Sequence, residues 1–457
     1  MFSDASQNTT RKTSSTAKER VKLCFTLLGM LIVAVTVGTL LLILAYCIPT
    51  KRISNNVATS IITFNEEGLY PFVKPRYVST VLDNWTDTLI YTEAMYRSGD
   101  ALQDAMLNPN TQYGNSDPLT NLNLVLKNQN TDENKDVANY PRYWHGYLIF
   151  VKPLLTICNL HQIRIINTTF QIVLICLLML LLYKKLNFLY ACAFFGVIMM
   201  INPLVTGKSL QFSSIQYAVL LSCLMLLVEK DKLFEKYRDI RIFCLTGIFV
   251  GYFDLLTYPL ASLGVPLLLC LAIYSNCLEN KNLSESKKLI ICIKTIIAEA
   301  ASWTISYVLM WSSKWFLTTW LTDTDAIQDA LNQANFRLSG EVTASSGTQL
   351  VKAALGTAAL NRNFILVLET NTLPALAVFA ILALLLLVLK KYKFSIKPHI
   401  LLCDIVISAW PLIWYMILKN HSYIHFWMTY RNLTLMTYAA FMIIASSFKS
   451  RYSISKS

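Results

Sequence analysis

The chain has 457 residues, of which 54% are hydrophobic and only 15% charged, and its mean hydropathy is +0.46. These values exclude an ordinary soluble enzyme, because the apolar residues gather in blocks of roughly 20 that are long enough to cross a bilayer. The net charge of +13 does not indicate a nucleic-acid partner, since Lys and Arg flank the apolar blocks instead of forming one basic face. The 11 cysteines contain no CxxC pair, which disfavours a thiol metal site. We expect an all-α integral membrane protein.

In chain order, a polar and basic tail over residues 1–20 precedes an apolar run from Val21 to Ile48. That run is too long for the core of a cleaved signal peptide, which has ~7–15 residues, so it predicts an uncleaved signal anchor. Further apolar blocks predict spans at about 163–184, 187–204, 210–229, 242–257, 259–276, 289–311, 367–389, 399–418 and 429–448. We therefore expect about ten transmembrane helices in one membrane domain over 21–448, followed by a short tail over 449–457.

The orientation follows from the basic residues at the ends of the spans, because Lys and Arg are enriched in short cytoplasmic loops. They fall on the same side as the basic N-terminal tail, at Lys184–Lys185, 230–241, Lys287–Lys288, Lys390–Lys391 and Lys449. This pattern predicts a multi-pass protein of the cell membrane with both termini in the cytoplasm. The outer face then carries large loops at 49–162 and 312–366 and a short one at 419–428.

The end of the first outer loop, over 143–155, mixes aromatic and aliphatic residues at helical spacing. It is too short and too polar to span, so it predicts a helix in the membrane interface, with Tyr143 and His145 as candidates for substrate contact. The alternative is a second span that starts slightly earlier.

Asp83 and Asp87 lie four residues apart in a part of this loop that we expect to be helical. Their carboxylates would therefore share one helix face. Such a pair at a membrane surface suits a general base or a divalent cation. Two solvated acids on a loop helix are the alternative.

Asp254 stands near the outer end of an expected span, just before a hairpin at Tyr258–Pro259. An ionisable residue at membrane depth costs at least ~2.5 kcal/mol, so it normally faces a polar cavity or a partner. We expect Asp254 to line a cavity that opens outward, unless it lies in water at the headgroup level.

Four further residues of the outer face are candidates for binding an anionic substrate. His421 and His425 have the i, i+4 spacing of a metal pair, but no HExxH-type acid accompanies them, and an interfacial role is the stronger interpretation. Arg431, at the start of the last span, could hold a lipid phosphate, although snorkelling to headgroups would also explain it. Arg337 follows a stretch that Thr324 or Asp325 could cap as a polar helix, and it is a second candidate anion ligand.

The signal anchor, the acidic first outer loop, the Tyr143–Leu154 stretch and Arg164 at the head of the second span together resemble the GT-C class of membrane glycosyltransferases. This class includes the protein mannosyltransferases and their bacterial relatives. The likeness covers about the first 280 residues and is architectural. The chain also resembles multi-spanning membrane proteins of low-GC Gram-positive bacteria, and its richness in Lys, Asn and Ile agrees with that.

The resemblance implies a transferase that moves a sugar from a polyprenyl-phosphate donor to a cell-envelope glycan or other acceptor on the outer face. An acid of the first outer loop would serve as catalytic base or metal-associated residue, a role that falls on Asp83 or Asp87. Glu66–Glu67 is a rival pair, because many relatives place adjacent acids closer to the first span. Arg164 would bind substrate.

Two other functions remain open from the sequence. A polysaccharide polymerase or ligase would also have many spans and a large outer loop with arginines. A non-enzymatic lipid or glycan transporter would need inverted repeats and broken helices near the midplane, and no convincing repeat is evident.

Overall fold

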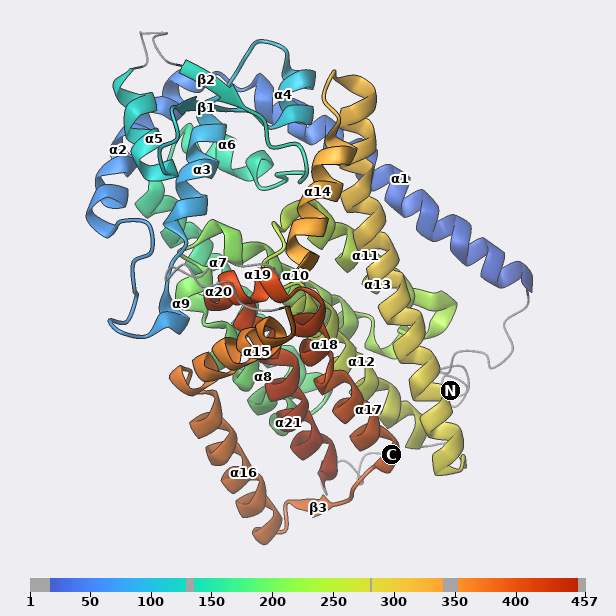
Figure 1. The fold of residues 1–457 in the computed structure, drawn as a ribbon. Helices are drawn as coiled ribbons and strands as arrows, with labels where there is room; N and C mark the ends of the chain where they lie inside the picture. Colours follow the sequence, from blue (N-terminus) through green and yellow to red (C-terminus); the bar gives the residue numbers. More distant parts are fainter. Residues whose placement is uncertain (1–16, 129–134, 280–281, 340–351, 451–457) are drawn as a thin grey trace.

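The computed structural model describes residues 17–128, 135–279, 282–339 and 352–450, which are mostly helical (Figure 1). Within these ranges, strand β1 (Asn110–Tyr113) pairs antiparallel with β2 (Lys135–Ala138), and β3 (Tyr392–Phe394) pairs with β4 (Phe448–Ser450). The all-α class expected from the sequence is confirmed. The expected tails over 1–20 and 449–457 lie largely outside the described residues.

Six helical segments of the described chain are long and apolar enough to cross a membrane: α1 (Ala17–Cys47), α7 (Leu160–Lys185), α10 (Leu210–Val228), α12 (Leu260–Glu279), α13 (Glu285–Leu321), and the consecutive α17 (Pro398–Ser408) and α18 (Trp410–Ile417). Helices α15 (Lys352–Glu369) and α16 (Thr372–Val388) add a seventh if they count as one span, although a bend of 59° separates them. Multi-spanning membrane character is therefore supported by length and composition.

Three of the expected spans are shorter in the structure. Helices α8 (Phe188–Ile201), α11 (Arg238–Phe253) and α21 (Thr434–Ser447) have 14, 16 and 14 residues, fewer than the roughly 20 that a bilayer requires. The physical reason is visible after α8, where Asn202 adopts a left-handed conformation (φ 60°) before Pro203 and ends the helix. The expected total of about ten spans thus stays a prediction.

The segment over 49–162, which we expected as the first outer loop, folds as a compact helical unit above the ends of the long helices (Figure 1), and we call it the first outer unit. It contains α2 (Thr50–Glu67), η1 (Val78–Thr80), α3 (Asn84–Met95), α4 (Ala101–Leu107), the β1–β2 pair, α5 (Pro118–Lys127) and α6 (Leu148–Leu155). Its core includes Phe64, Tyr91 and Trp144, and the Trp144 indole donates a 2.6 Å hydrogen bond to the Met310 carbonyl of α13. This hydrogen bond therefore holds the unit against helix α13.

Helix α6 is the element that we expected over 143–155, but it begins only at Leu148. Asn159 caps α7 through a reciprocal capping box with Gln162, which separates α7 from α6. The alternative of one longer second span is therefore wrong.

Helices α11 and α13 pack closely through small residues. Gly247 and Gly251 of α11 face α13, and Ser302 and Ser306 of α13 donate hydrogen bonds of 2.9 and 3.0 Å to carbonyls of α11. This is the small-xxx-small pattern by which membrane helices bring their backbones together.

The loop expected over 312–366 is helical where the structure describes it. Helix α13 continues to Leu321, α14 (Ala326–Ser339) follows, and Asp325 accepts a 2.9 Å hydrogen bond from the Gln328 N–H, which confirms it as a cap of the polar helix. The remaining short elements are α9 (Pro203–Thr206), η2 (Lys230–Lys232), η3 (Glu235–Tyr237), α19 (Lys419–Ile424), α20 (Phe426–Thr429) and η4 (Tyr430–Leu433).

The η1 turn connects the first outer loop to the C-terminal part of the chain. The Ser79 N–H donates a 2.8 Å hydrogen bond to the Glu369 carboxylate of α15. The Ser79 carbonyl accepts hydrogen bonds from the Tyr430 hydroxyl and the Arg431 guanidinium at 2.9 and 3.4 Å. The η1 turn, early in the sequence, thus contacts segments from the C-terminal part of the chain.

Candidate functional site

Asp83 caps the N-terminus of α3 instead of lying on its face. One carboxylate oxygen accepts the Thr86 N–H at 3.1 Å and the other accepts the Thr86 hydroxyl at 2.9 Å. The helix expected around the acidic pair exists, but it begins one residue after Asp83. The carboxylate keeps lone pairs for a further donor.

Asp87, in the first turn of α3, is fully buried and accepts the backbone N–H of Leu210 at 3.1 Å. It therefore acts as an N-terminal cap for α10, a helix 123 positions further along the chain. A negative charge at this position also interacts favourably with the positive end of the helix dipole. The acidic pair thus sets the relative position of α3 and α10.

Arg164 joins four segments below the acidic pair. Its Nη1 donates to both carboxylate oxygens of Glu67 at 2.8 and 2.9 Å, Nη2 donates to the Asn84 amide oxygen at 2.9 Å, and Nε donates to the Lys208 carbonyl at 2.9 Å. Glu67, the rival acid of the sequence analysis, is thereby engaged in an ion pair. This arrangement makes Arg164 and Glu67 positioning residues for the start of α3.

Burial raises the pKa of Asp83 to about 6, against the smaller opposing effect of the Thr86 hydrogen bonds. Burial also raises the pKa of Asp87 well above its ordinary value, although the nearby Arg164 charge opposes this. A carboxylate that titrates near neutral pH is suited to general base work. Asp83 is 3% exposed, whereas Asp87 is fully buried. Of the two acids, only Asp83 therefore combines a pKa near neutral with some exposure to solvent.

Asp254 is the residue directly after α11, as expected from the hairpin that follows it. Its carboxylate accepts hydrogen bonds from the Thr257 N–H (3.0 Å), the Thr257 hydroxyl (2.5 Å) and the Ser214 hydroxyl of α10 (3.3 Å). Ser214 lies four residues after Leu210, which places it about 6 Å further along α10. Asp87 and Asp254 thus bind the first and second turns of the same helix.

An apolar cavity of about 350 Å³ lies along this part of α10 and includes both Leu210 and Ser214 in its wall. It shares Leu221, Phe249 and Phe253 with an adjoining apolar cavity of about 430 Å³ that reaches α1. A third cavity of about 300 Å³, between α1 and α6, shares Ile149 and Phe150 with its neighbours. We call this continuous path between α1, α6, α7, α10 and α11 the apolar groove.

The apolar groove opens on the side of the molecule, where several of its lining residues are exposed. Leu44, Phe150 and Phe170 are 62%, 59% and 55% exposed. Leu44 and Phe170 lie on the candidate membrane helices α1 and α7, where exposed large apolar side chains indicate contact with lipid chains. The groove therefore extends from a lipid-facing surface to the residues that Asp87 and Asp254 bind.

Arg337 of α14 meets His421 of α19. The Arg337 Nη1 donates to His421 Nδ1, and His421 Nε2 donates to the Leu256 carbonyl at 2.8 Å. Burial, with the neighbouring His425 and Arg337, lowers the pKa of His421 well below its ordinary value, so the ring is neutral. Among the described residues, no carboxylate pairs with Arg337, and its charge is available to an anion.

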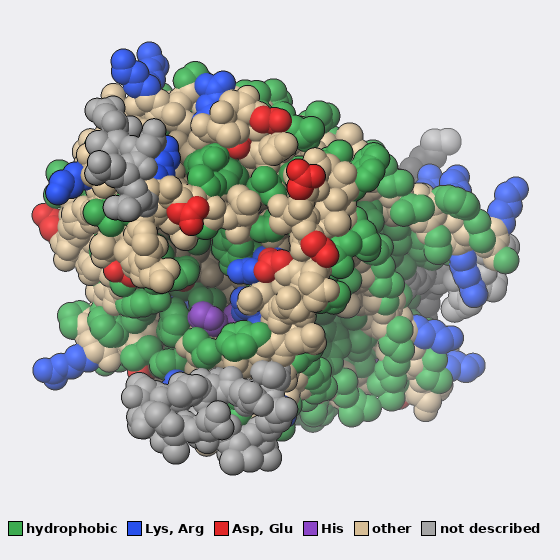
Figure 2. Space-filling view, turned by 45° about the horizontal axis from the view of Figure 1, so that its top comes forward, with side chains coloured by type: hydrophobic (Ala, Val, Ile, Leu, Met, Phe, Trp, Pro, Cys, Tyr) green, Lys and Arg blue, Asp and Glu red, His purple; other side chains and the backbone are tan. Residues whose placement is uncertain are grey.

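Aromatic rings connect Arg337 to the region of Asp83. Tyr70 contacts Trp427 with ring centroids 5.5 Å apart, Trp427 contacts His425 at 5.3 Å, and His425 contacts His421 at 4.9 Å. The Asp83 carboxylate, after burial, is the second cause of the raised pKa of Tyr70, which places Tyr70 near Asp83. Figure 2 shows a face of the molecule that is hollowed in its middle, with a histidine and Lys or Arg side chains inside the hollow.

Tyr143 and His145, the two candidates of the interfacial stretch, are both buried. Tyr143 stacks on Trp311 of α13 at 5.4 Å. His145 is held at both ring nitrogens, by Glu93 at 3.1 Å and by the Tyr140 carbonyl at 2.9 Å, and its backbone has a φ of 52°. His145 therefore fixes the turn before α6, and Glu93, its acidic partner, was not identified from the sequence.

Arg431 is fully buried and donates to the Ile201 carbonyl at 3.1 Å and to the Trp427 carbonyl at 3.0 Å, in addition to Ser79. Its guanidinium lies 4.6 Å from the centroid of the Phe212 ring. These contacts hold η4 against α8 and η1. They do not place the guanidinium in the hollow.

Gln211 is a further candidate that the sequence analysis missed. It lies in the first turn of α10 and is 8% exposed, and its amide oxygen has no hydrogen-bond partner among the described residues. Its amide nitrogen is 4.0 Å from the sulfur of Met428, beside Trp427. A glutamine in the first turn of an apolar helix is the signal that could have identified it.

The described residues do not fit the divalent cation considered for the acidic pair. Asp83 and Asp87 direct their carboxylates to different elements, and no cluster of three or more His, Cys, Asp or Glu residues that could hold a metal ion occurs in this part of the chain or elsewhere in the described ranges. His421 uses both ring nitrogens for Arg337 and Leu256. We therefore assign no step to a metal.

Comparison of the chain with protein-family models, with curated proteins and with solved structures finds no match in any of the three.

Proposed function

We propose that this chain is a membrane glycosyltransferase of the GT-C kind, which moves a sugar from a polyprenyl-phosphate donor to a glycan or other acceptor at the outer face of the cell membrane. The observation that carries the proposal is the course of the apolar groove. It begins at lipid-facing side chains and ends at Leu210 and Ser214, the residues bound by Asp87 and Asp254. In this proposal the lipid tail of the donor lies in the groove and its headgroup leaves the groove at the end formed by Leu210 and Ser214.

In this proposal Asp83 is the catalytic base. Its carboxylate takes the proton of the acceptor hydroxyl as that oxygen attacks the anomeric carbon, and the bond from this carbon to the donor phosphate breaks with its electron pair on the phosphate. The products are a glycosidic bond and polyprenyl phosphate. Asp87 and Arg164 position Asp83 through α10 and Asn84.

Arg337 is the cation proposed to balance the charge of the leaving phosphate, because no carboxylate among the described residues neutralises it. Neutral His421 supports this role by accepting one guanidinium N–H and leaving the others for phosphate oxygens. Gln211, whose amide oxygen lacks a described partner, is proposed to contact a sugar hydroxyl.

The topology proposed with this function has about ten spans and both termini in the cytoplasm. Basic residues at Lys184–Lys185 and Lys390–Lys391 support the orientation. The three short helices α8, α11 and α21 would cross only together with the segments that flank them.

The test is the glycan composition of the cell surface in a deletion strain that is complemented with the wild type, Asp83→Asn or the control Asp136→Asn. Asp136 is exposed on β2 in the same outer unit, and the substitution is the same. We expect the deletion to remove one sugar, and the wild type and the control to restore it while Asp83→Asn does not, at equal protein abundance. Unchanged glycans after deletion would refute the transferase proposal and favour transport.

A further inference from the structure

A separate, polar cavity of about 210 Å³ lies at the end of the molecule opposite the candidate site. It is formed where α12 ends, α13 begins and α17 begins, together with the β3–β4 ladder. Helix α13 has 37 residues and runs from this cavity to α14 beside the outer hollow, so about 55 Å separate its two ends. The two sites therefore share no residues.

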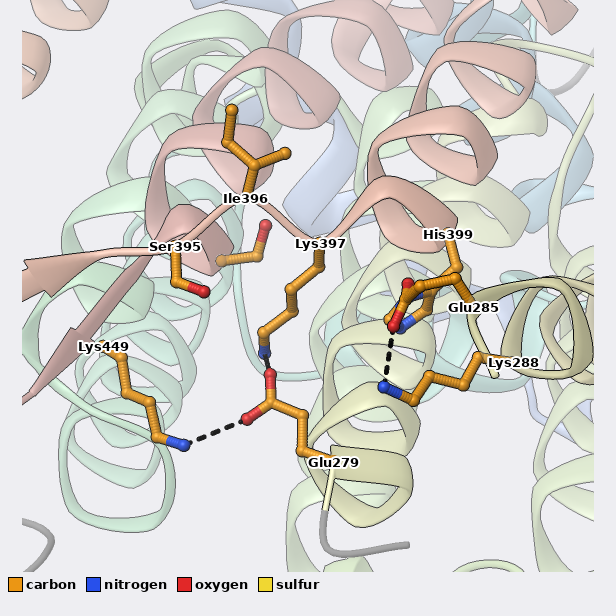
Figure 3. Close-up of a pocket in the computed structure, with 9 residues that line it drawn as sticks. Glu279, Glu285, Lys288, Ser395, Ile396, Lys397, His399 and Lys449 are labelled. Atoms are coloured by element: carbon orange, nitrogen blue, oxygen red, sulfur yellow. Dashed lines mark hydrogen bonds and ion pairs between the residues drawn. The ribbon is translucent and has the colours of Figure 1, made fainter. Parts of the chain in front are cut away.

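The side chains of this cavity form two cation-rich groups, as Figure 3 shows. Glu279 accepts Lys397 at 2.6 Å and Lys449 at 3.2 Å. Glu285 accepts Lys288 at 2.8 Å and His399 at 2.7 Å.

The positive and negative charges of the side chains that line the cavity do not balance. Three lysines face two carboxylates, which leaves one positive charge before His399 is counted. Two of the three ammonium groups are held in place, since the side chains of Lys397 and Lys288 are only 11% and 14% exposed. Each ammonium has three donors, so those on Glu279 can bind a further oxygen. This arrangement favours an anion.

Apolar side chains border the cavity on the β3 side. Ile396 lines it and is 53% exposed, and Phe394 of β3 is 55% exposed. Three residues separate the end of α16 from strand β3, and α17 begins directly after Lys397, so both apolar residues lie close to the ends of candidate membrane helices. An anion with attached acyl chains would satisfy both the basic cavity and its apolar border.

We propose that this cavity binds the headgroup phosphate of an anionic phospholipid, with Lys397 and Lys449 as its principal ligands and Phe394 and Ile396 against the acyl chains. Free phosphate shares the charge chemistry but would not use the apolar border. The proposal is independent of the proposed glycosyl transfer.

The experiment measures the thermal midpoint of the purified full chain in a neutral detergent, by tryptophan fluorescence. The probes are dihexanoyl phosphatidylglycerol, dihexanoyl phosphatidylcholine and inorganic phosphate. The variants are Lys449→Gln and Lys397→Gln, with Lys393→Gln as the control. Lys393 is an exposed lysine on β3 that pairs across the ladder with Lys449 but does not line the cavity, so its substitution removes the same charge nearby and leaves every side chain of the cavity in place.

We expect phosphatidylglycerol to raise the midpoint in a saturable manner, while phosphatidylcholine and phosphate do not. Lys449→Gln and Lys397→Gln should weaken the apparent affinity roughly tenfold, and Lys393→Gln should leave it unchanged. Lys449 is 57% exposed, so its variant folds even if Lys397→Gln does not. An equal response of Lys449→Gln and Lys393→Gln, or an equal effect of phosphatidylcholine, would overturn the proposal, and an equal effect of inorganic phosphate would overturn the lipid as its ligand.

Discussion

Gly247 of α11 lies directly against Ser306 of α13: a Cβ atom at Gly247 would stand 2.3 Å from the Ser306 hydroxyl oxygen and 2.3 Å from the Trp303 carbonyl oxygen. Because one of these atoms belongs to the backbone, a side chain at Gly247 requires the two helices to separate. The separation would also weaken the 3.0 Å hydrogen bond from Ser306 to the Cys244 carbonyl.

We therefore predict that Gly247→Ala lowers the stability of the protein by about 1–3 kcal/mol, the usual cost of overpacking a close helix contact. The measurement is thermal unfolding of the purified protein in detergent. Gly29→Ala is the matched control, because no atom lies within 4 Å of a Cβ at Gly29. Equal midpoints for the two variants would contradict the close packing of α11 on α13.

Arg164→Lys should destabilise the first outer unit by about 3 kcal/mol. An ammonium group cannot reach Glu67, Asn84 and the Lys208 carbonyl together, so the substitution breaks a largely buried ion pair. The control is Arg142→Lys, which alters an ion pair with Asp329 whose side chains are 23% and 34% exposed. We expect that change to cost less than about 1 kcal/mol. Similar losses in the two variants, measured by chemical denaturation, would refute the positioning role of Arg164.

The raised pKa of Asp83 predicts a defined pH dependence of stability. The pKa is 3.8 in the unfolded chain and about 6 in the folded protein, so the folded state holds the proton more tightly. The contribution of Asp83 to stability is therefore fully present below about pH 4 and is lost as the pH rises through about 6.

Asp83→Asn removes this dependence and keeps the cap of α3, since asparagine is also a good N-cap. Relative to wild type, the variant should gain about 2 kcal/mol of stability between pH 4.5 and 7.5, because about 1 of the total of about 3 kcal/mol is already lost in the wild type by pH 4.5. Asp136→Asn, an exposed acid, should follow the wild type at both pH values. A constant difference between Asp83→Asn and wild type over this range would show that Asp83 titrates normally.

Under the proposed function, Arg337→Gln should raise the KM for the polyprenyl-phosphate donor roughly tenfold, because a charge-assisted hydrogen bond to phosphate is lost while the contact with His421 can persist. Arg337→Lys should recover part of this loss. Arg362→Gln is the control, since Arg362 lies over the Tyr423 ring, 4.0 Å from its centroid, and is exposed. Equal KM values for Arg337→Gln and Arg362→Gln would remove Arg337 from the donor site.

The sequence pattern predicted where helices occur more accurately than it predicted the residues at which they begin and end. Apolar periodicity located α7, α10, α12 and α13, but the left-handed Asn202 that ends α8 gives no signal in a hydropathy profile. The hairpin before Pro259 was predicted correctly, because proline and a nearby acid are local signals. The packing of α11 on α13 through Gly247 and Gly251 could also have been read from their spacing.

Contacts within the candidate site were beyond sequence reasoning for a different reason. Arg337 and His421 were both singled out, yet they are 84 positions apart and nothing local indicates that they meet. Glu67 was treated as a rival catalytic acid, since its ion-pair partner Arg164 lies 97 positions away and nothing local indicates that the two residues meet. Residue type was enough to name the candidate site residues. Only the tertiary arrangement shows which of these side chains support the site and which face it.

The η1 turn places a constraint on biosynthesis. Ser79 finds its partners at Glu369 and Tyr430, which lie 290 and 351 positions later, so the turn has none of these contacts until nearly the whole chain has been made. The first outer unit must remain incomplete while the later helices are inserted. A protein shortened before η4 would retain every acid of the candidate site and the Glu369 contact, but it would lack the Tyr430 and Arg431 contacts to Ser79, so we expect proteases to cleave its first outer unit more readily than that of the full chain.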